Sequence, residues 1–243
     1  MDAVTETMPF VRTMADGPRK IAVCGHFGSG KTEFSVSLAM AMARLGCTPM
    51  ALCDLDIENP YFRSRERQEL LESVGVRVYS DPFHGRNASE LQVIDPAIRA
   101  PLENEHCRVI LDCGGDHTGA MILNQFSRYL QEDTALLCVV NSCRPGTDTP
   151  QKALEQLRLT EETTGLRVTG LVSNAHLVRF TTSDTVREGL TFAREVEQLS
   201  GVPLVAVCAM EGICRLLERE GSLGAPLFPI GMYMRDSYLD KEV

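Results

Sequence analysis

One glycine-rich segment constrains the fold of this chain more than any other feature. It runs from Gly25 to Thr32 with the sequence GHFGSGKT, and it directly follows four apolar residues at positions 21–24. After it, apolar residues recur every three or four positions from Phe34 to Leu45, and Gly46 ends the pattern. An apolar run, a glycine-rich break and a helical period predict a strand, a tight turn and a helix in that order.

The same alternation continues along the chain. Short apolar runs, which we interpret as strands, occupy residues 50–53, 76–79, 109–111, 135–140, 168–172 and 204–208. Between them lie stretches with helical patterns, near residues 70–71, 96–103, 121–130, 151–163 and 186–199. Strands that are apolar along their whole length are buried on both faces, as in a parallel sheet covered by helices on each side. We therefore expect an α/β fold, a three-layer α/β/α sandwich around a mostly parallel central sheet.

Length and pattern together indicate the domain organisation. Residues 1–18 show no periodicity and end in Asp16-Gly17-Pro18, which predicts a flexible N-terminal tail. Residues 19–243 contain no internal repeat or linker, and a chain that is 44% apolar can build one substantial core. We expect residues 19–243 to form a single domain.

Charge and cysteine usage exclude several classes of function. The formal net charge of −9 argues against a nucleic-acid partner. The first residues lack the basic and apolar regions of a signal peptide, and no run of about eighteen apolar residues predicts a membrane span. We expect a cytoplasmic protein. Nine cysteines without a Cys-x-x-Cys pair indicate neither a disulfide framework nor a zinc ribbon.

The glycine-rich segment also satisfies G-x-x-x-x-G-K-[ST], the P-loop pattern. Its glycines let successive N–H groups face phosphates, and the helix that follows adds the positive end of its dipole. In such loops the lysine, here Lys31, reaches the β and γ phosphates, and the hydroxyl of Thr32 binds Mg²⁺. We predict that ATP and Mg²⁺ are held by the residues of this loop and the next position: Gly25, His26, Phe27, Gly28, Ser29, Gly30, Lys31, Thr32 and Glu33.

Carboxylates follow two of the other predicted strands. Asp54 and Asp56 come after residues 50–53, at the sheet edge where ligands of such folds bind, although they could equally cap a helix. Asp112 ends the run 109–111 as in a Walker B segment, whose carboxylate binds Mg²⁺ directly or through water. Gly115 stands three residues later, where its amide could sense the γ-phosphate. The predicted metal set is therefore Thr32, Asp54 and Asp112.

Taken together, these segments resemble the SIMIBI class of P-loop NTPases, and within it the MinD/ParA/CobQ-like ATP-binding proteins. The sequence is especially similar to a bacterial group that shares the stretches GHFGSGKTE at residues 25–33 and DLDIENPYFRSR at residues 54–65. The resemblance covers nearly all of residues 19–240. It implies a P-loop, a switch I at residues 54–59 and a switch II at residues 112–116. It also implies that Asp56 orients the attacking water, which makes Lys31 and Asp56 the catalytic residues, and that two copies of the chain form a homodimer.

One position departs from that family's pattern. MinD-like loops carry a second lysine after the first glycine, and this chain has His26 there. A protonated His26 could donate to a phosphate, whereas an uncharged one could simply pack in the loop. One of the arginines at positions 63, 65 and 67 could supply the missing charge as an arginine finger; alternatively they form a solvated helix face, with Arg65 paired to Glu69.

The resemblance also bears on the base and on two cysteines. It places Asn174, at the end of a late strand, against adenine, and the residues after it do not form the Asn-Lys-x-Asp box of many GTPases. Residues 207–210 could pack on the base edge or belong to the core. Cys113 and Cys143 could hold a metal between two subunits, as cysteines do in the nitrogenase iron protein, but that protein's ligand pattern is absent here.

We interpret the chain as a Mg-ATP-binding protein and slow ATPase. It would act as a nucleotide-dependent switch, or as an accessory or maturation factor, for a protein partner. Two alternatives remain open. One is an ATP-dependent small-molecule ligase or kinase of the dethiobiotin or cobyrinate synthetase type, which would use His84, Arg86 or His117 beside the γ-phosphate. The other is a nucleotide-binding regulator with negligible turnover.

Overall fold

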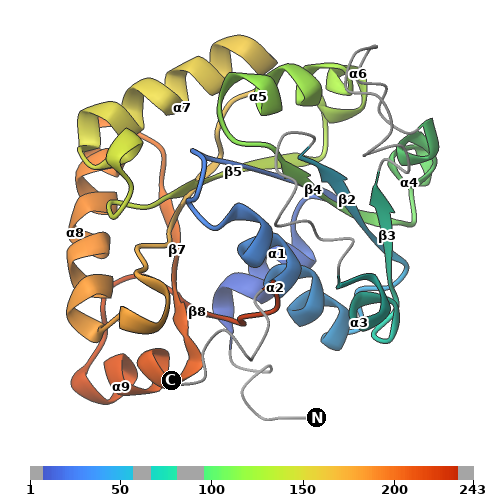
Figure 1. Ribbon diagram of the computed structural model, residues 1–243. Coiled ribbons are helices and arrows are strands. Elements are labelled where there is room, and N and C mark those ends of the chain that lie inside the picture. Colours follow the sequence, from blue (N-terminus) through green and yellow to red (C-terminus); the bar gives the residue numbers. More distant parts are fainter. Residues whose placement is uncertain (1–7, 57–66, 81–95, 235–243) are drawn as a thin grey trace, which may run out of the picture.

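The computed structural model of the protein describes residues 8–56, 67–80 and 96–234. Its centre is one eight-stranded sheet with the strand order β3-β2-β4-β1-β5-β6-β7-β8, and every pair of neighbouring strands is parallel (Figure 1). The strands are β1 (Lys20–Cys24), β2 (Met50–Leu55), β3 (Val76–Ser80), β4 (Arg108–Cys113), β5 (Thr134–Val140), β6 (Gly170–Ser173), β7 (Leu204–Met210) and β8 (Leu227–Ile230).

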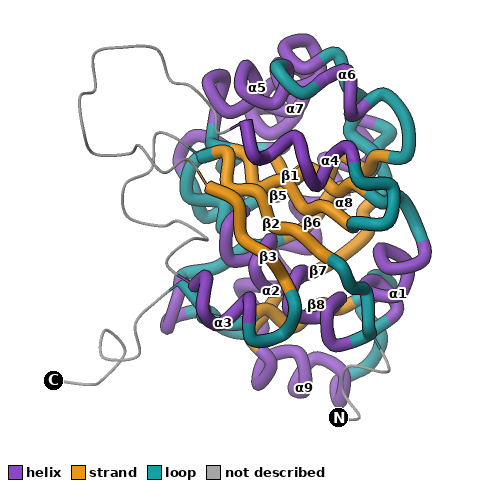
Figure 2. The backbone as a smooth tube through the Cα atoms, turned by 90° about the vertical axis from the view of Figure 1, so that its right-hand side faces the viewer, coloured by secondary structure: helices purple, strands orange, loops and turns teal. Residues whose placement is uncertain are grey.

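Helices cover both faces of this sheet, so the predicted three-layer α/β/α architecture is confirmed (Figure 2). One face carries α1 (Pro9–Asp16), α2 (Lys31–Arg44) and α3 (Gln68–Glu72). The other carries α4 (Arg99–Glu103), α5 (Asp116–Asn124), α6 (Ser127–Leu130), α7 (Pro150–Thr164), α8 (Ser183–Ser200) and α9 (Glu211–Glu220). Within the described ranges, no helix is both long and apolar enough to cross a bilayer.

Alternate residues of each strand supply two separate cores, because successive side chains point to opposite faces of a sheet. In β1, Ile21 and Val23 belong to the core beneath α2, whereas Ala22 and Cys24 belong to the core beneath α5 and α7. The strands are therefore buried on both faces, as their unbroken apolar character predicts.

The N-terminal stretch differs from the prediction of a flexible tail over residues 1–18. Residues 9–16 form α1, and Phe10, Val11 and Met14 are buried on one side of it. The Phe10 ring lies 6.0 Å from that of Phe34 and 5.4 Å from that of Phe228, measured between centroids. The tail prediction is wrong for these residues because a helix of two turns is too short to show a clear period in the sequence.

The C-terminal part holds two further elements that the sequence patterns did not indicate. Helix α9 buries only Cys214 and Leu217, and β8 is a four-residue strand that contains Pro229. Proline lacks an N–H group, and β8 accommodates it because it is the edge strand of the sheet. The strand brings the chain back beside α2, where the site described next is built.

Candidate functional site

The glycine-rich loop occupies the connection predicted for it, between β1 and α2. Three of its glycines have positive φ angles, which are 142° at Gly25, 74° at Gly28 and 88° at Gly30. A Cβ atom on Gly25 would lie 2.4 Å from the carbonyl oxygen of Val139, and one on Gly30 would lie 2.4 Å from Nδ2 of Asn174. The loop thus needs glycine for its backbone angles and for its close approach to the ends of β5 and β6.

Lys31 and Ser29 give this loop the chemistry of an anion site. Lys31 opens α2, has only 5% of its surface exposed, and donates from Nζ to the carbonyl oxygen of His26 over 3.2 Å. The Ser29 hydroxyl is buried and has no hydrogen-bond partner within the described part of the chain. A buried ammonium and an unsatisfied hydroxyl at a helix N-terminus fit a phosphate group.

The predicted carboxylates meet at the neighbouring strand ends. Asp54 of β2 and Asp112 of β4 are direct register partners, so their side chains leave the same face of the sheet. Both are buried, as is Asp56, whose backbone N–H donates to Oδ1 of Asp54 over 3.1 Å. The Ser35 hydroxyl of α2 donates to Oδ1 of Asp112 over 3.2 Å, which ties this cluster to the helix of the loop.

Burial among these acids strongly perturbs the pKa of Asp112. Burial raises its pKa to about 8, and the charges of Asp54 and Asp56 act in the same direction. The Lys31 ammonium and a hydrogen bond from Thr32 lower that pKa but do not outweigh burial. A hard divalent cation would offset the repulsion, and carboxylate and hydroxyl oxygens are ligands that Mg²⁺ prefers. The structure brings Thr32, Asp54 and Asp112 close together, and their binding of Mg²⁺ stays a prediction.

The loop after β4 lies directly against the glycine-rich loop. A Cβ atom on Gly115 would be 2.9 Å from the backbone nitrogen of Phe27, and one on Gly114 would be 3.3 Å from Oδ1 of Asp56. Gly115 therefore packs against the phosphate loop, and the contact of its amide with a γ-phosphate stays a prediction. A side chain at Gly115 would push the two loops apart.

Asn174 has a role that the sequence did not indicate. Its Nδ2 donates to the carbonyl oxygen of Ser29 over 2.8 Å, and its backbone N–H donates to Val140 over 2.9 Å, so it fastens the glycine-rich loop to the end of β5. Its Oδ1 is buried and lacks a partner among the described residues. Asn174 also lines the cavity described next, so the predicted contact with a base stays a prediction.

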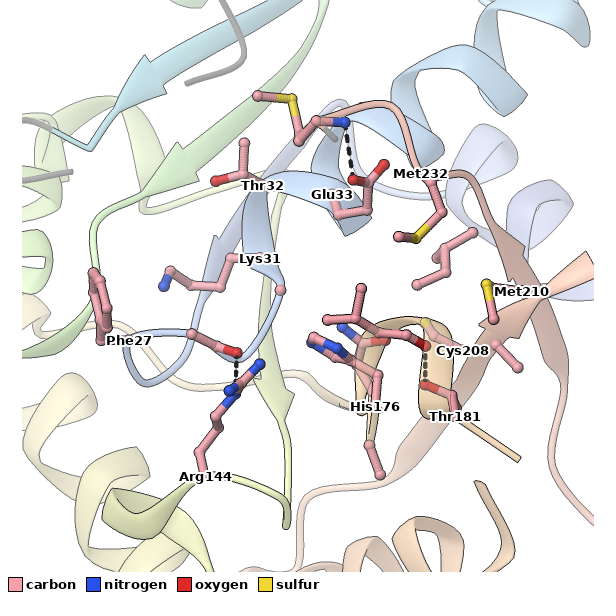
Figure 3. Close-up of a pocket in the computed structure, with 18 of the residues that line it drawn as sticks. Phe27, Lys31, Thr32, Glu33, Arg144, His176, Thr181, Cys208, Met210 and Met232 are labelled. Atoms are coloured by element: carbon pink, nitrogen blue, oxygen red, sulfur yellow. Dashed lines mark hydrogen bonds between the residues drawn. The ribbon is translucent and has the colours of Figure 1, made fainter. Parts of the chain in front are cut away.

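A cavity of about 250 Å³ opens beside the loop (Figure 3). Lys31 and Thr32 lie toward one end of the cavity, and Cys208, Met210 and Met232, which are apolar and carry sulfur, lie toward the other (Figure 3). Gly30 and Asp56 also line the cavity, as do the apolar residues Ala209, Ile230 and Met234. A polar, cationic end followed by an apolar end matches the phosphates and the base of a nucleotide. The sequence left open whether residues 207–210 pack on the base or belong to the core, and residues 208–210 line this cavity.

Arg144 and His176 line the same cavity and were not predicted. Arg144, in the loop after β5, donates from Nε to the carbonyl oxygen of Gly28 over 2.8 Å. His176 follows β6, and burial together with the positive charge of Arg144 lowers its pKa to about 4. Neither residue belongs to a recognisable sequence motif. Only their positions after apolar runs could have suggested that they lie at the ligand edge of the sheet.

Glu33 was predicted to contact the nucleotide, and the structure gives it other partners. Its two carboxylate oxygens accept hydrogen bonds from the backbone N–H groups of Tyr233 (2.6 Å) and Met234 (3.0 Å). Burial raises the pKa of Glu33 to about 7, while these two bonds and the charge of Arg67 act in the opposite direction. Sequence patterns gave no sign of this contact, which joins positions 200 and 201 residues apart.

The structure also bears on His26 and the arginines. A Cβ atom on Gly146 would lie 2.1 Å from Nε2 of His26, so the imidazole packs against the loop after β5. Arg67 donates from Nε to the carbonyl oxygen of Tyr233, which fixes that side chain in place. Several other predicted site residues lie outside the described residues: Arg63, Arg65, His84, Arg86 and residues 57–59 of switch I. The side chain of His117 also lies outside them.

The two cysteines proposed as metal ligands lie in different surroundings. Cys113 is buried in the core, its thiol lies 3.7 Å from the carbonyl oxygen of Leu111, and burial raises its pKa. Cys143 is half-buried in the loop after β5. In the part of the chain that the structure describes, no group of three or more histidine, cysteine, aspartate or glutamate side chains could hold a metal ion.

The parallel sheet, its two helical layers and the glycine-rich loop define the class of fold, which is the P-loop NTPase α/β fold. Among solved structures, FtsY from Mycoplasma mycoides is 14% identical over 76% of this chain and 58% of its own, with a TM-score of 0.50. Chloroplast FtsY from Physcomitrella patens is 20% identical over 77% of this chain and 57% of its own, also with a TM-score of 0.50.

This likeness supports the P-loop α/β fold predicted from the sequence and does not extend to the MinD/ParA/CobQ-like family. The chain spans less than two thirds of the length of these FtsY proteins. No family model matches the chain, and no curated protein sequence does so either. At these identities the comparison establishes the fold alone.

Proposed function

We propose that this protein binds Mg-ATP and hydrolyses it slowly, as a nucleotide-dependent switch. The observation that carries the proposal is the meeting of a buried Lys31, the glycine-rich loop and the buried cluster of Asp54, Asp56 and Asp112 beside a cavity that also has an apolar end. Nucleotides are bound on this fold at the carboxyl ends of the strands, where these residues lie.

The apolar end of the cavity favours adenine over guanine. Guanine-specific sites offer a carboxylate to the N1 and N2 donors of the base. Among the described residues that line this cavity, the carboxylates are Glu33 and Asp56. Both oxygens of Glu33 already accept backbone N–H groups, and Asp56 belongs to the aspartate cluster at the phosphate end. An adenine ring needs no such acceptor and can pack against methionine side chains.

Each residue of the phosphate end has a role in this proposal. Lys31 and the loop amides would bind the phosphates, and Thr32, Asp54 and Asp112 would hold Mg²⁺, which supplies charge stabilisation. Asp56 would orient the attacking water, since phosphoryl transfer depends mainly on positioning and charge. Slow turnover follows because position 26 carries a histidine that packs on Gly146 rather than a lysine.

The switch would operate through the contact between Gly115 and Phe27. A γ-phosphate bound near Phe27 would alter the packing of the loop after β4, and that change would reach α5. Phe27 is 58% exposed at the rim, where an apolar side chain suits a protein surface such as a second copy of the chain or another partner. We retain the cytoplasmic location and the homodimer as parts of the proposal.

Two measurements test the proposal together. Competition against a fluorescent ATP analogue should show Mg-ATP displacing the probe at a lower concentration than Mg-GTP does. Single-turnover phosphate release should then be slow and should depend on Asp56, with Asp56→Asn reducing the rate while leaving ATP affinity close to that of the wild type. Tighter binding of GTP would refute the adenine assignment. Release that needs an added small-molecule carboxylate would favour the ligase or kinase alternative, and tight binding without release would favour the regulator.

A further inference from the structure

We infer that Glu33 is a positioning residue that holds the segment 231–234, here called the strap, as the wall of the base end of the cavity. The strap directly follows β8 and runs beside the first turns of α2 (Figure 3). The inference rests on the proposed function and deepens it. It makes the affinity for the base depend on Glu33, a residue next to the phosphate loop that acts through the strap and contacts neither phosphate nor base.

Four hydrogen bonds attach the strap to its surroundings. At its start, the Gly231 N–H donates to the Ser37 hydroxyl of α2 over 3.0 Å. At its end, the carboxylate of Glu33 receives the N–H groups of Tyr233 and Met234. Arg67 also donates to the carbonyl oxygen of Tyr233. A four-residue segment bonded at both ends is held in one conformation with respect to α2.

The strap contributes directly to the apolar end of the cavity. Met232 and Met234 line it together with Ile230, and Met234 is only 6% exposed. Gly231 is needed at the turn, because a Cβ atom there would lie 2.3 Å from the Tyr233 ring. The position of the methionines therefore depends on the bonds that keep the strap against α2.

Glu33 suits this task because each of its two carboxylate oxygens accepts a backbone N–H group, and an ionised carboxylate offers acceptors on both oxygens. Glutamine would keep one oxygen for one of the two backbone N–H groups and would turn an NH₂ group toward the other, leaving a donor facing a donor. Hydrogen bonds to a charged group are also stronger than those between neutral groups. Glu33→Gln should thus loosen the strap while it preserves the size of the side chain.

The test compares ligands with and without a base. Isothermal calorimetry would measure the affinity of the purified full chain for Mg-ATP, or for Mg-GTP if that binds more tightly, and for Mg-tripolyphosphate. For Glu33→Gln we expect nucleotide affinity to fall about 10-fold, while tripolyphosphate affinity stays within about twofold of wild type. The matched control is Glu72→Gln, since Glu72 is an exposed glutamate whose bond to Gln68 lies on α3.

A second variant guards against misfolding of Glu33→Gln. Ser37→Ala removes the other anchor of the strap without leaving a charge unpaired, and it should lower nucleotide affinity selectively by about threefold. Equal losses for nucleotide and tripolyphosphate in both variants, or no loss in either, would overturn the inference. The wild type alone decides the proposed function: if it binds no nucleotide, that proposal fails and the strap inference falls with it.

Discussion

Alanine substitutions at Gly30 and Gly46 separate two costs in one experiment: the strain of a left-handed backbone and the steric clash of an added Cβ atom. Both have a φ angle of 88°, and both flank α2. A Cβ atom on Gly46 would meet nothing within 4 Å, whereas one on Gly30 would lie 2.4 Å from Nδ2 of Asn174. Gly46→Ala therefore adds only the strain of a left-handed backbone, while Gly30→Ala must also displace the Asn174 amide.

The expected magnitudes follow from these contacts. A left-handed alanine costs about 1 kcal/mol. Displacing Asn174 breaks its 2.8 Å bond to the Ser29 carbonyl in a buried place, which costs about 1–3 kcal/mol more. We predict a loss of about 1 kcal/mol in the free energy of unfolding for Gly46→Ala and about 2–4 kcal/mol for Gly30→Ala.

Urea unfolding followed by far-ultraviolet circular dichroism measures both values, because the chain has no tryptophan to report by fluorescence. The same samples should show that Gly30→Ala loses Mg-ATP binding and that Gly46→Ala keeps it. Equal losses of stability, or unchanged ATP affinity in Gly30→Ala, would refute the argument that Asn174 packs against this glycine to shape the loop.

Three further predictions concern pH, the metal site and the core. The pKa of His176 is lowered from 6.5 to about 4, so the folded state loses stability as pH falls through this interval. Urea unfolding of the wild type should show a loss of about 2 kcal/mol between pH 7 and pH 5, and His176→Gln should remove that loss. An unchanged pH dependence of stability in His176→Gln would contradict this. The pKa of Asp112 is raised, so the folded state loses stability as pH rises from about 4 to 8, and Asp112→Asn should flatten this pH dependence in the nucleotide-free protein. The same substitution should remove the Mg²⁺ dependence of ATP affinity. If calorimetry shows that this dependence is retained, Asp112 does not bind the metal. Phe10→Ala should cost about 3–4 kcal/mol in unfolding by urea because Phe10 is 2% exposed between two aromatic rings, whereas a loss below about 1 kcal/mol would mean that α1 does not pack as described.

The sheet was predictable from sequence because its strands are buried on both faces. The unbroken apolar runs at 21–24, 109–111 and 135–140 correspond to β1, β4 and β5, with end residues that differ by at most two positions. Helix α1 and strand β8 escaped prediction because each is short and takes its stability from contacts with distant residues. Phe10 and Phe228, for example, meet across more than two hundred residues of sequence.

The phosphate end of the site was predictable for a different reason. Backbone geometry forces a fixed spacing of glycines, lysine and threonine, and a carboxylate at the end of a parallel strand must lie at the ligand edge. The base end carries no such spacing. The strap reaches Glu33 only because β8 returns beside α2, and Arg144 reaches Gly28 only because the loop after β5 lies next to the P-loop. Contacts of that kind depend on the complete fold.

The most direct test of the central claim is calorimetric titration of the purified protein with ATP and GTP, with and without Mg²⁺. It should be run in parallel on wild type, Lys31→Ala and the surface control Lys152→Ala. We predict one Mg-ATP site per chain, weaker binding of GTP, a loss of at least about 100-fold in ATP affinity for Lys31→Ala and no change for Lys152→Ala. Absence of binding for both nucleotides in the wild type, or unaltered affinity in Lys31→Ala, would contradict the assignment of a nucleotide site to this loop.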